Sequence, residues 1–209
     1  NLHVVNYSVP ISASMPLEKL RQHLYTKPDQ PNAIPYVTSY YDETWGFCIS
    51  QQQLDDLPSG TYQVMIDSSL TDGQMTFADG VLPGESDREI LFSTNICHPS
   101  LANNELSGPV LASFLYEILA QCKLKHTYRF VFIPETIGAL VYLSQHGDHL
   151  KNYLDAGYVI TCVGDDGPFT YKRSRHGSTN ADKVAEHCMK HIQSGSEVKV
   201  MDYSPFGSD

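Results

Sequence analysis

The sequence is poor in charged residues, and basic residues are in the minority. Of its 209 residues only 18% are charged, and 14 Lys and Arg stand against 24 Asp and Glu, which gives a formal net charge of -10. An electrostatic field of this sign opposes broad contact with a phosphate backbone. We therefore expect no nucleic-acid partner.

The sequence also lacks long apolar runs and a signal peptide. No segment approaches the roughly 20 apolar residues of a membrane helix, and residues 1–30 lack the charged start and apolar run of a secretory signal. The five cysteines are odd in number and far apart, without a CxxC pair or zinc-finger spacing, so neither a disulfide framework nor a zinc knuckle is supported. We expect a soluble cytoplasmic protein with reduced core thiols and no membrane partner.

Neither end of the sequence has the features of a complete chain. It begins at Asn1 rather than Met, and it stops at Asp209 without a closing helix or strand. We therefore expect a fragment of a longer protein, with a C-terminal part missing.

Two compositional zones are present, without internal repeats. Residues 28–84 are rich in Tyr, Thr, Ser, Gln, Gly and Pro and have short alternating runs, which predict a small β-rich subdomain. From Glu89 onward, apolar strands alternate with helical stripes, which is typical of βαβ units. A short amphipathic helix is predicted over residues 16–25. The sequence thus predicts an α/β domain made of residues 1–27 and 85–209, with residues 28–84 inserted into it.

The second zone predicts a mostly parallel sheet with helices on both faces. The strands are expected at residues 90–97, 128–134, 158–163 and 197–203, and the helices at 110–122, 137–150 and 181–192. Ligands of open α/β sheets bind beyond the carboxyl ends of the strands. The residues that directly follow each strand are therefore the candidates for a site.

Polar side chains follow three successive predicted strands. His98 follows the first strand, Glu135 the second, and Asp165 and Asp166 the third. Imidazole and carboxylate groups are ligands of catalytic zinc sites, and a further carboxylate could take a proton from a metal-bound water. A His after a strand and an Asp-Asp-Gly turn are each ordinary structural features. Their joint position after three strands nevertheless favours a site.

The same motifs resemble those of a known clan. His98, the loop 102–108, Glu135, Asp165 and the terminal Gly-Ser-Asp resemble, in order, the motifs of the zinc aminopeptidase clan, which includes bacterial leucyl aminopeptidases, glutamate carboxypeptidases and glutaminyl cyclases. Stretches such as 36–41, 45–48, 66–70, 96–100 and 171–175 look like a bacterial branch of aminopeptidase-like proteins that is often encoded near polysaccharide-biosynthesis genes. The resemblance covers nearly the whole chain and implies a zinc-exopeptidase-like fold.

The resemblance also implies roles for individual residues. By its motifs, His98 is a metal ligand, Asn104 occupies the position of the metal-bridging carboxylate, and Glu135 is the general base. Asp165 is a ligand of a second metal, with Asp166 as the alternative.

The sequence departs from the clan at two of these positions. Asn104 stands where the two-metal enzymes have a bridging Asp, and Thr136 stands where they have a second Glu. A neutral amide offsets little of the repulsion between two divalent cations, so we expect one zinc ion rather than two. Glu105 is one residue out of register and is not expected to replace Asn104. The final metal-binding His would lie beyond Asp209, so this fragment could lack zinc altogether.

Substrate-binding candidates come from two further segments. Residues 171–176 form the main basic cluster of an acidic chain, and Arg173 and Arg175 could bind a substrate carboxylate or phosphate. The alternative is a charged strand edge that prevents aggregation. Ser208 and Asp209, in the terminal motif, are the remaining candidates.

Three functions remain open at this stage. The first is a metal-dependent aminopeptidase-like hydrolase acting on an amide or peptide bond of a small substrate with a free amino end. The second is a catalytically inactive module of the same fold that binds a sugar-linked or peptide ligand, which the departures at Asn104 and Thr136 favour. The third is an interaction domain that makes its contact through an exposed aromatic face around Trp45. The sequence leaves the oligomeric state open.

Overall fold

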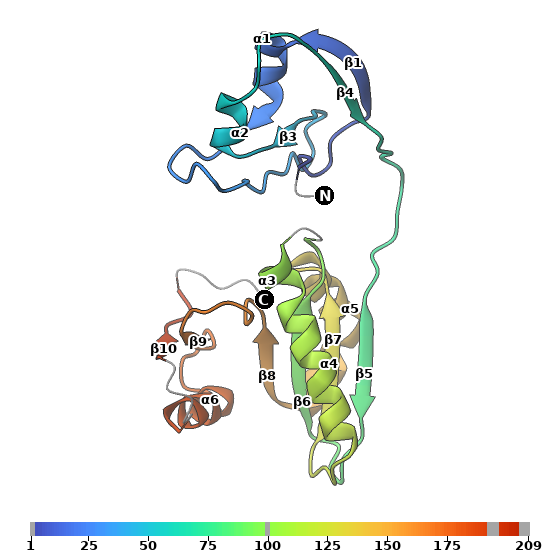
Figure 1. Cartoon of the computed structure of the whole chain (residues 1–209). Helices are drawn as coiled ribbons and strands as arrows, with labels where there is room; N and C mark the ends of the chain where they lie inside the picture. The colour runs from blue at the N-terminus through green and yellow to red at the C-terminus, as the bar shows by residue number, and fades with distance from the viewer. Residues whose placement is uncertain (1–2, 99–100, 192–196, 205–209) are drawn as a thin grey trace. The chain divides into compact units, whose positions relative to one another are not determined.

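A computed structural model describes residues 3–98, 101–191 and 197–204 of the chain, which divides into two compact units. The first unit spans Asn1–Gln74 and the second Met75–Asp209 (Figure 1). Within the described ranges, no helix is long and apolar enough to cross a membrane.

The first unit consists of short strands and helical turns. Strand β1 pairs antiparallel with β4, from Ile11 opposite Ile66 to Pro16 opposite Thr61, and β2 pairs parallel with β3. The elements are β1 (Ile11–Pro16), α1 (Leu17–Leu20), the 3-10 turn η1 (Arg21–His23), β2 (Leu24–Tyr25), β3 (Phe47–Cys48), α2 (Gln51–Asp55) and β4 (Thr61–Ile66).

The boundary between the units differs from the expected insertion. Residues 1–27, assigned from sequence to the α/β domain, supply β1 and β2 to the β-rich zone. Leu17 and Leu20 are buried in this unit together with Val64 and Ile66. Because the apolar side chains of residues 1–27 are buried in the first unit, the β-rich zone and this N-terminal segment form one unit. Trp45 is half-buried and stacks on the ring of His23, with 3.7 Å between ring centroids. The nearby Tyr40 and Tyr41 are 67% and 100% exposed, so the exposed aromatic side chains of the third hypothesis are these two and not Trp45.

The second unit is built on a four-stranded mixed sheet with the strand order β5-β7-β6-β8 (Figure 1). Strands β6, β7 and β8 run parallel, and β5 is an antiparallel edge strand. The elements are β5 (Ala78–Leu82), β6 (Glu89–Asn95), α3 (Ala102–Glu105), α4 (Ser107–Ala120), β7 (Thr127–Ile133), α5 (Ile137–Tyr153), β8 (Leu154–Ile160), β9 (Phe169–Lys172), α6 (Asn180–Lys190) and β10 (Val198–Met201).

The main sheet is mixed, with three parallel strands and one antiparallel edge strand, so the expectation of a mostly parallel sheet holds only in part. The fourth strand, expected at residues 197–203, is observed as β10 (Val198–Met201), which pairs with β9 in a separate two-stranded sheet. The place of a fourth strand is taken by β5, which precedes the apolar zone in the chain. Strand pairing between distant segments decides the sheet here, and local periodicity does not encode it.

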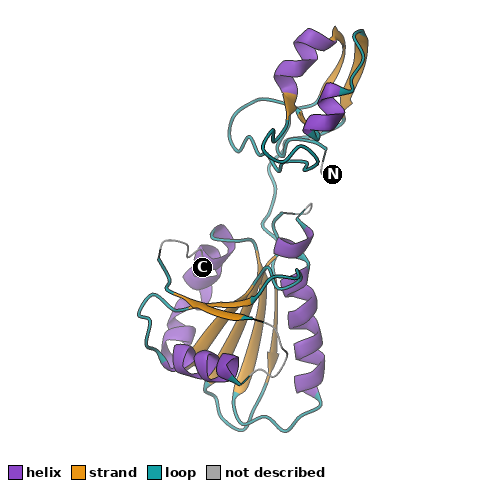
Figure 2. Ribbon diagram, turned by 60° about the vertical axis from the view of Figure 1, so that its left-hand side comes forward, coloured by secondary structure: helices purple, strands orange, loops and turns teal. Residues whose placement is uncertain are grey.

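Helices lie on both sides of the sheet, as predicted (Figure 2). In β7, Phe130 contacts Tyr116 of α4 edge-on, with 5.3 Å between ring centroids, whereas Val131 joins a core cluster with Tyr142 and Leu150 of α5. Successive side chains of a strand point to opposite faces, so α4 and α5 cover opposite faces.

Gly108 sets the position of the α4 N-terminus at the sheet edge. A Cβ atom at this residue would lie 2.3 Å from both Ile160 O and Thr94 Oγ1. Only glycine permits this approach, which brings α3 and the start of α4 against the ends of β6 and β8.

Candidate functional site

Three loops meet at the carboxyl ends of β6, β7 and β8. The Glu135 amide, after β7, donates a hydrogen bond to Cys97 Sγ, after β6, at 3.2 Å. The Gly164 amide, after β8, donates to Asn103 Oδ1 of α3 at 2.8 Å. The residues that follow three strands therefore converge, with α3 linked to the first and third loops.

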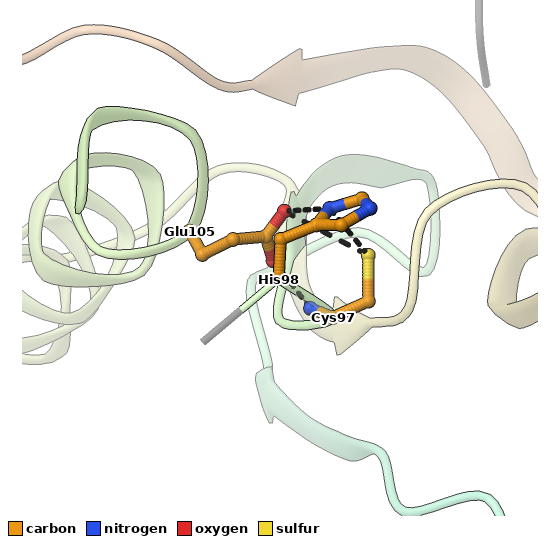
Figure 3. A group of neighbouring side chains, drawn as sticks. All are labelled: Cys97, His98 and Glu105. Atoms are coloured by element: carbon orange, nitrogen blue, oxygen red, sulfur yellow. Dashed lines mark hydrogen bonds and ion pairs between the residues drawn. The ribbon is translucent and has the colours of Figure 1, made fainter. Parts of the chain in front are cut away.

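Cys97, His98 and Glu105 form a compact group of side chains at this edge (Figure 3). His98 Nδ1 lies 2.9 Å from Glu105 Oε1 and 3.3 Å from Cys97 Sγ, and the Cys97 thiol donates to Glu105 Oε1 at 3.7 Å. Glu105 Oε2 accepts a hydrogen bond from the Cys97 backbone amide. Within the described part of the chain, this is the one group of three or more His, Cys, Asp or Glu ligand atoms close enough to hold a metal ion.

The single turn α3 directs Glu105 into the group. The Glu105 amide donates to Leu101 O at 2.8 Å, which closes the turn, and the Glu105 side chain is only 4% exposed. The neighbouring Asn104 points elsewhere, with its amide nitrogen 3.8 Å from Cys162 Sγ. The structure thus places Glu105, and not Asn104, beside His98.

The surroundings of Cys97 disfavour its charged form in the absence of a cation. Burial raises the pKa of the Cys97 thiol, the hydrogen bond from the Glu135 amide opposes this, and the negative charges of Glu105 and Glu135 add to the rise. The three side chains form a hydrogen-bonded triad.

Glu135 stands on a strained turn between β7 and α5. Thr136 has φ 60° and ψ -67°, and the Ile137 amide donates to Glu135 O at 2.7 Å. These angles define the rare form of γ-turn, which is disfavoured for a residue with a side chain. Such strain concentrates at functional sites, and here it follows the predicted base directly.

Asp165 and Asp166 lie outside the group. Both are exposed, and Asp165 accepts hydrogen bonds from Asn103 Nδ2 at 2.6 Å and from the Gly167 amide at 2.7 Å. Asp165 therefore reaches α3 through Asn103, while Glu105 of the same turn faces His98. The predicted ligands His98, Asn104 and Asp165 come from loops that meet, but their side chains have different partners.

The two arginines of the basic cluster have different surroundings. Arg173 donates from Nε to Glu186 at 2.7 Å and from Nη1 to Asp202 at 2.8 Å, so its guanidinium group is already engaged by two carboxylates. Arg175 is exposed and lies over the ring of Tyr203, 5.3 Å from its centroid. Arg175 is the more accessible of the two. Ser208 and Asp209 fall outside the described residues.

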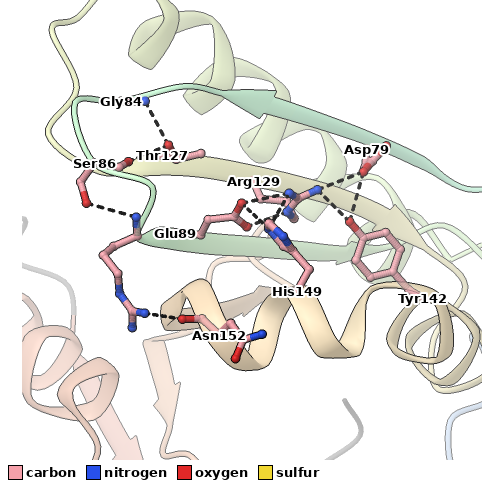
Figure 4. A network of polar contacts seen from close by, with 10 residues as sticks. Asp79, Gly84, Ser86, Glu89, Thr127, Arg129, Tyr142, His149 and Asn152 are labelled. Carbon is pink, nitrogen blue, oxygen red and sulfur yellow. Dashed lines mark hydrogen bonds and ion pairs between the residues drawn. The ribbon is translucent and has the colours of Figure 1, made fainter.

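A second polar network joins the sheet to α5 (Figure 4). Buried Glu89 accepts hydrogen bonds from Arg129 Nε at 2.7 Å and Nη2 at 3.0 Å, and His149 Nε2 lies 2.8 Å away. Arg129 Nη1 also reaches Tyr142 at 3.3 Å and Asp79 at 3.4 Å. Since buried Glu89 and Arg129 already form an ion pair, we interpret the network as structural.

The first unit contains a cavity of about 450 Å³. Its lining is largely apolar and includes Leu20, Leu24, Phe47, Ile49 and Leu57. No described group of three His, Cys, Asp or Glu ligand atoms lies there, so the cavity could accept an apolar group but offers no comparable chemistry.

Sequence reasoning missed Cys97 and Glu105. The sequence suggested a core thiol at position 97 and an out-of-register acid at position 105. Cys97 is half-buried, and three other cysteines, Cys122, Cys162 and Cys188, are exposed. The available signal was Cys97 adjoining His98 at a strand end. The orientation of Glu105 could not be read from one helical turn.

The chain matches a family model described as "Domain of unknown function (DUF4910)" over residues 3–209. It belongs to this family. It is also 46% identical, over all of its 209 residues, to a Clostridium acetobutylicum protein called "Putative polysaccharide biosynthesis protein with aminopeptidase-like domain", of which it covers 48%.

A solved structure supports the same relationship. A crystal structure of a "putative peptidase" from Clostridium acetobutylicum matches the whole chain with a TM-score of 0.93 and 46% sequence identity, and the match covers 49% of that protein. The chain thus spans about half the length of these two relatives, and it shares the fold of the matched part of the solved structure.

The donor atoms of the Cys97 group fit a metal ion of the zinc type. Zinc accepts thiolate, imidazole and carboxylate ligands, and bonds of about 2.0–2.3 Å place tetrahedral ligands about 3.3–3.6 Å apart. Nδ1 and Oε1 are 2.9 Å apart, Sγ and Nδ1 are 3.3 Å apart, and Sγ and Oε1 are 3.7 Å apart. Shifts of a few tenths of an ångström would bring them to this geometry.

Proposed function

We propose that the chain is part of a metal-dependent, aminopeptidase-like hydrolase that cleaves an amide or peptide bond of a small substrate. The observation that carries the proposal is the group of zinc-type donors at the ends of parallel strands, directly beside Glu135. The aminopeptidase-like and peptidase names of the two relatives support it.

Glu135 is the proposed general base. Its backbone amide donates a hydrogen bond to Cys97 Sγ at 3.2 Å, which places residue 135 next to the donor group. His98 would hold zinc, which when bound supplies a Lewis acid for the amide carbonyl and increases the acidity of a water molecule. Glu135 takes a proton from the attacking water and passes it to the leaving amine.

The structure favours one zinc ion over two. Asn104 is neutral and directed to Cys162, and Asp165 is bound to Asn103, so no described carboxylate is positioned as a bridge in the place of Asn104. Arg175, which is exposed, is the arginine proposed to bind a substrate carboxylate, because Arg173 is already engaged by two carboxylates. All five cysteines are free, which supports the proposal of a reducing, cytoplasmic setting.

A catalytically inactive binding module is the second candidate. The neutral Asn104, and Thr136 directly after Glu135, favour it because both replace carboxylates of the clan pattern. Its ligand would be sugar-linked or peptide, in keeping with the polysaccharide biosynthesis named for the relative. This candidate predicts no amide turnover by the wild-type protein.

The Glu135→Gln variant of the full-length protein tests the hydrolase. We expect it to lose amide turnover by about 100-fold or more, because general-base catalysis contributes on this scale, and to keep its zinc. Turnover is measured with amino-acid anilides and small peptides, and zinc by elemental analysis. Glu117→Gln, on the exposed surface of α4, is the matched control and should leave both unchanged. Undiminished turnover in Glu135→Gln would contradict the role of Glu135.

A further inference from the structure

We infer that the metal site of this chain is formed by Cys97, His98 and Glu105, with the Cys97 thiolate as a ligand. The resemblance to the clan implies a different set, in which His98 is joined by Asn104 and Asp165. The inference deepens the proposed function and rests on it for the presence of a metal, but not for turnover.

The first argument is the geometry of the three donor atoms (Figure 3). Cys97 Sγ, His98 Nδ1 and Glu105 Oε1 all lie within 4.8 Å of one another, and the shortest separation is 2.9 Å. In the metal-free protein these contacts are hydrogen bonds. A metal ion that replaces the shared protons needs only small movements of the donors, because their separations of 2.9–3.7 Å bracket those of tetrahedral ligands.

The second argument is the support that the backbone gives to two of the donors. Glu105 Oε2 accepts from the Cys97 amide, which leaves Oε1 facing His98. The Glu135 amide donates to Cys97 Sγ at 3.2 Å. Hydrogen bonds from outside the ligand set orient metal ligands and tune them, and a backbone donor aimed at sulfur stabilises the thiolate that a metal requires.

The third argument is charge balance. The Glu105 side chain is 4% exposed and the His98 side chain 26% exposed. A buried carboxylate is costly unless it is paired or coordinates a metal, and one divalent cation would match the charge of a carboxylate and a thiolate ligand. Three protein ligands also leave one tetrahedral position open, as catalytic zinc sites do.

The set implied by the resemblance lacks these features. Asn104 Nδ2 is 3.8 Å from Cys162 Sγ, and Asp165 Oδ2 is 2.6 Å from Asn103 Nδ2. Asp165 is exposed. To join His98, both side chains would have to leave their present partners.

Cobalt substitution of the full-length protein tests the inference without measuring activity. Co²⁺ occupies zinc sites, and a thiolate ligand gives it an intense charge-transfer absorption in the near ultraviolet that nitrogen and oxygen ligands do not give. We expect this band in the wild-type protein at one equivalent of Co²⁺. Bound Co²⁺ without the band would overturn the inference, and this result needs no variant.

Variants locate the ligands. Cys97→Ser should abolish the band, whereas Cys162→Ser, which removes the thiol beside Asn104, should keep it. Glu105→Gln should weaken Co²⁺ and Zn²⁺ binding by more than about tenfold, since even groups behind the ligands change affinity 10- to 100-fold. Asp165→Asn should leave affinity unchanged. Two results would place the site at the third loop instead. One is loss of the band in Cys162→Ser. The other is weaker metal binding in Asp165→Asn together with unchanged metal binding in Glu105→Gln. Circular dichroism checks that each variant is folded.

The failure of this inference can be told apart from failure of the proposed function. A cobalt–thiolate band in a protein that hydrolyses no amide would support the Cys97 site and contradict the proposed hydrolase. Metal-dependent turnover without the band would support the hydrolase and contradict Cys97 as a metal ligand.

Discussion

At the scale of single residues, Asp182 shows how one buried carboxylate organises a loop. Asp182 is 1% exposed and accepts hydrogen bonds from the amide and hydroxyl groups of both Ser174 and Thr179, and from the Tyr171 hydroxyl. Thr179 caps α6, and its hydroxyl accepts from the Asp182 amide. Asp182 therefore attaches the loop that contains the basic cluster to the start of α6.

We expect Asp182→Asn to destabilise the protein by about 2–4 kcal/mol, because the amide replaces an acceptor by a donor that faces other donors. Chemical denaturation measures the effect. Asp148→Asn, at an exposed position of α5, is the matched control and should change stability by less than about 0.5 kcal/mol. Equal effects of the two substitutions would contradict the account of Asp182.

The contribution of Asp182 should also depend on pH. Burial alone would raise its pKa, but the hydrogen bonds from Ser174 and Thr179 outweigh burial and hold the pKa well below the usual range. With a folded-state pKa below the unfolded value of about 3.9, the unfolded state binds the proton first as the pH falls. The stability difference between wild type and Asp182→Asn should be constant above about pH 5 and shrink below about pH 4. A difference that grows on acidification would show the opposite sign.

The sequence predicts some site residues better than others. His98 and Glu135 follow strands whose apolar runs are clear, so their place at the sheet edge follows from the pattern. The direction of Glu105 depends on the backbone of one turn, α3, and no periodicity can be read from four residues. The partners of Arg173 come from α6 and from residue 202, too distant in sequence for local patterns to reveal.

At the scale of elements, a comparison of β7 and α4 indicates that apolar side chains contribute unequally to the free energy of unfolding. Phe130 in β7 is 0% exposed, whereas Phe114 in α4 is 61% exposed. We expect Phe130→Ala to cost about 3–5 kcal/mol and Phe114→Ala less than about 1 kcal/mol. Thermal unfolding of the two variants, which lose the same atoms, provides the comparison. A large loss in Phe114→Ala would mean that α4 is covered in solution.

The network around Glu89 should contribute more than a surface ion pair. Arg129→Met leaves the buried Glu89 carboxylate without its main partner, and breaking a buried pair costs about 3–5 kcal/mol. Arg88→Met removes an exposed pair with Asp155 and should cost less than about 1 kcal/mol. Denaturant unfolding of both variants tests the difference. A cost for Arg129→Met no larger than that for Arg88→Met would contradict the burial argument.

Element positions were predictable where apolar residues are regular. The observed bounds of β6, β7, α4 and α5 lie within about three residues of those expected. Strand β8 begins at Leu154, four residues before the prediction, because Asp155 and Gly157 interrupt its apolar pattern. The predicted helix over residues 16–25 ends at His23, where β2 pairs with β3. Pairing with distant segments decided both the β9–β10 sheet and the edge strand β5.

At the scale of the whole molecule, residues 67–77 connect the two units without helix or strand. We expect limited proteolysis to cut first near the exposed Leu70 and to leave two folded fragments. Trp45 is the single tryptophan and lies in the first unit, so its fluorescence reports whether that unit stays folded after cleavage, and we expect the emission of a folded unit. Mass spectrometry identifies the cut. A first cut within β6, β7 or β8 would contradict the division.

The zinc content of the purified full-length protein tests the central claim most directly, when it is measured by elemental analysis beside that of the His98→Ala variant. The account predicts about one zinc ion per chain in the wild type, because His98 belongs to the donor group at the sheet edge, and none in the variant. Absence of bound metal after zinc addition, or equal zinc in the two proteins, would contradict a metal-dependent hydrolytic site at the ends of β6, β7 and β8.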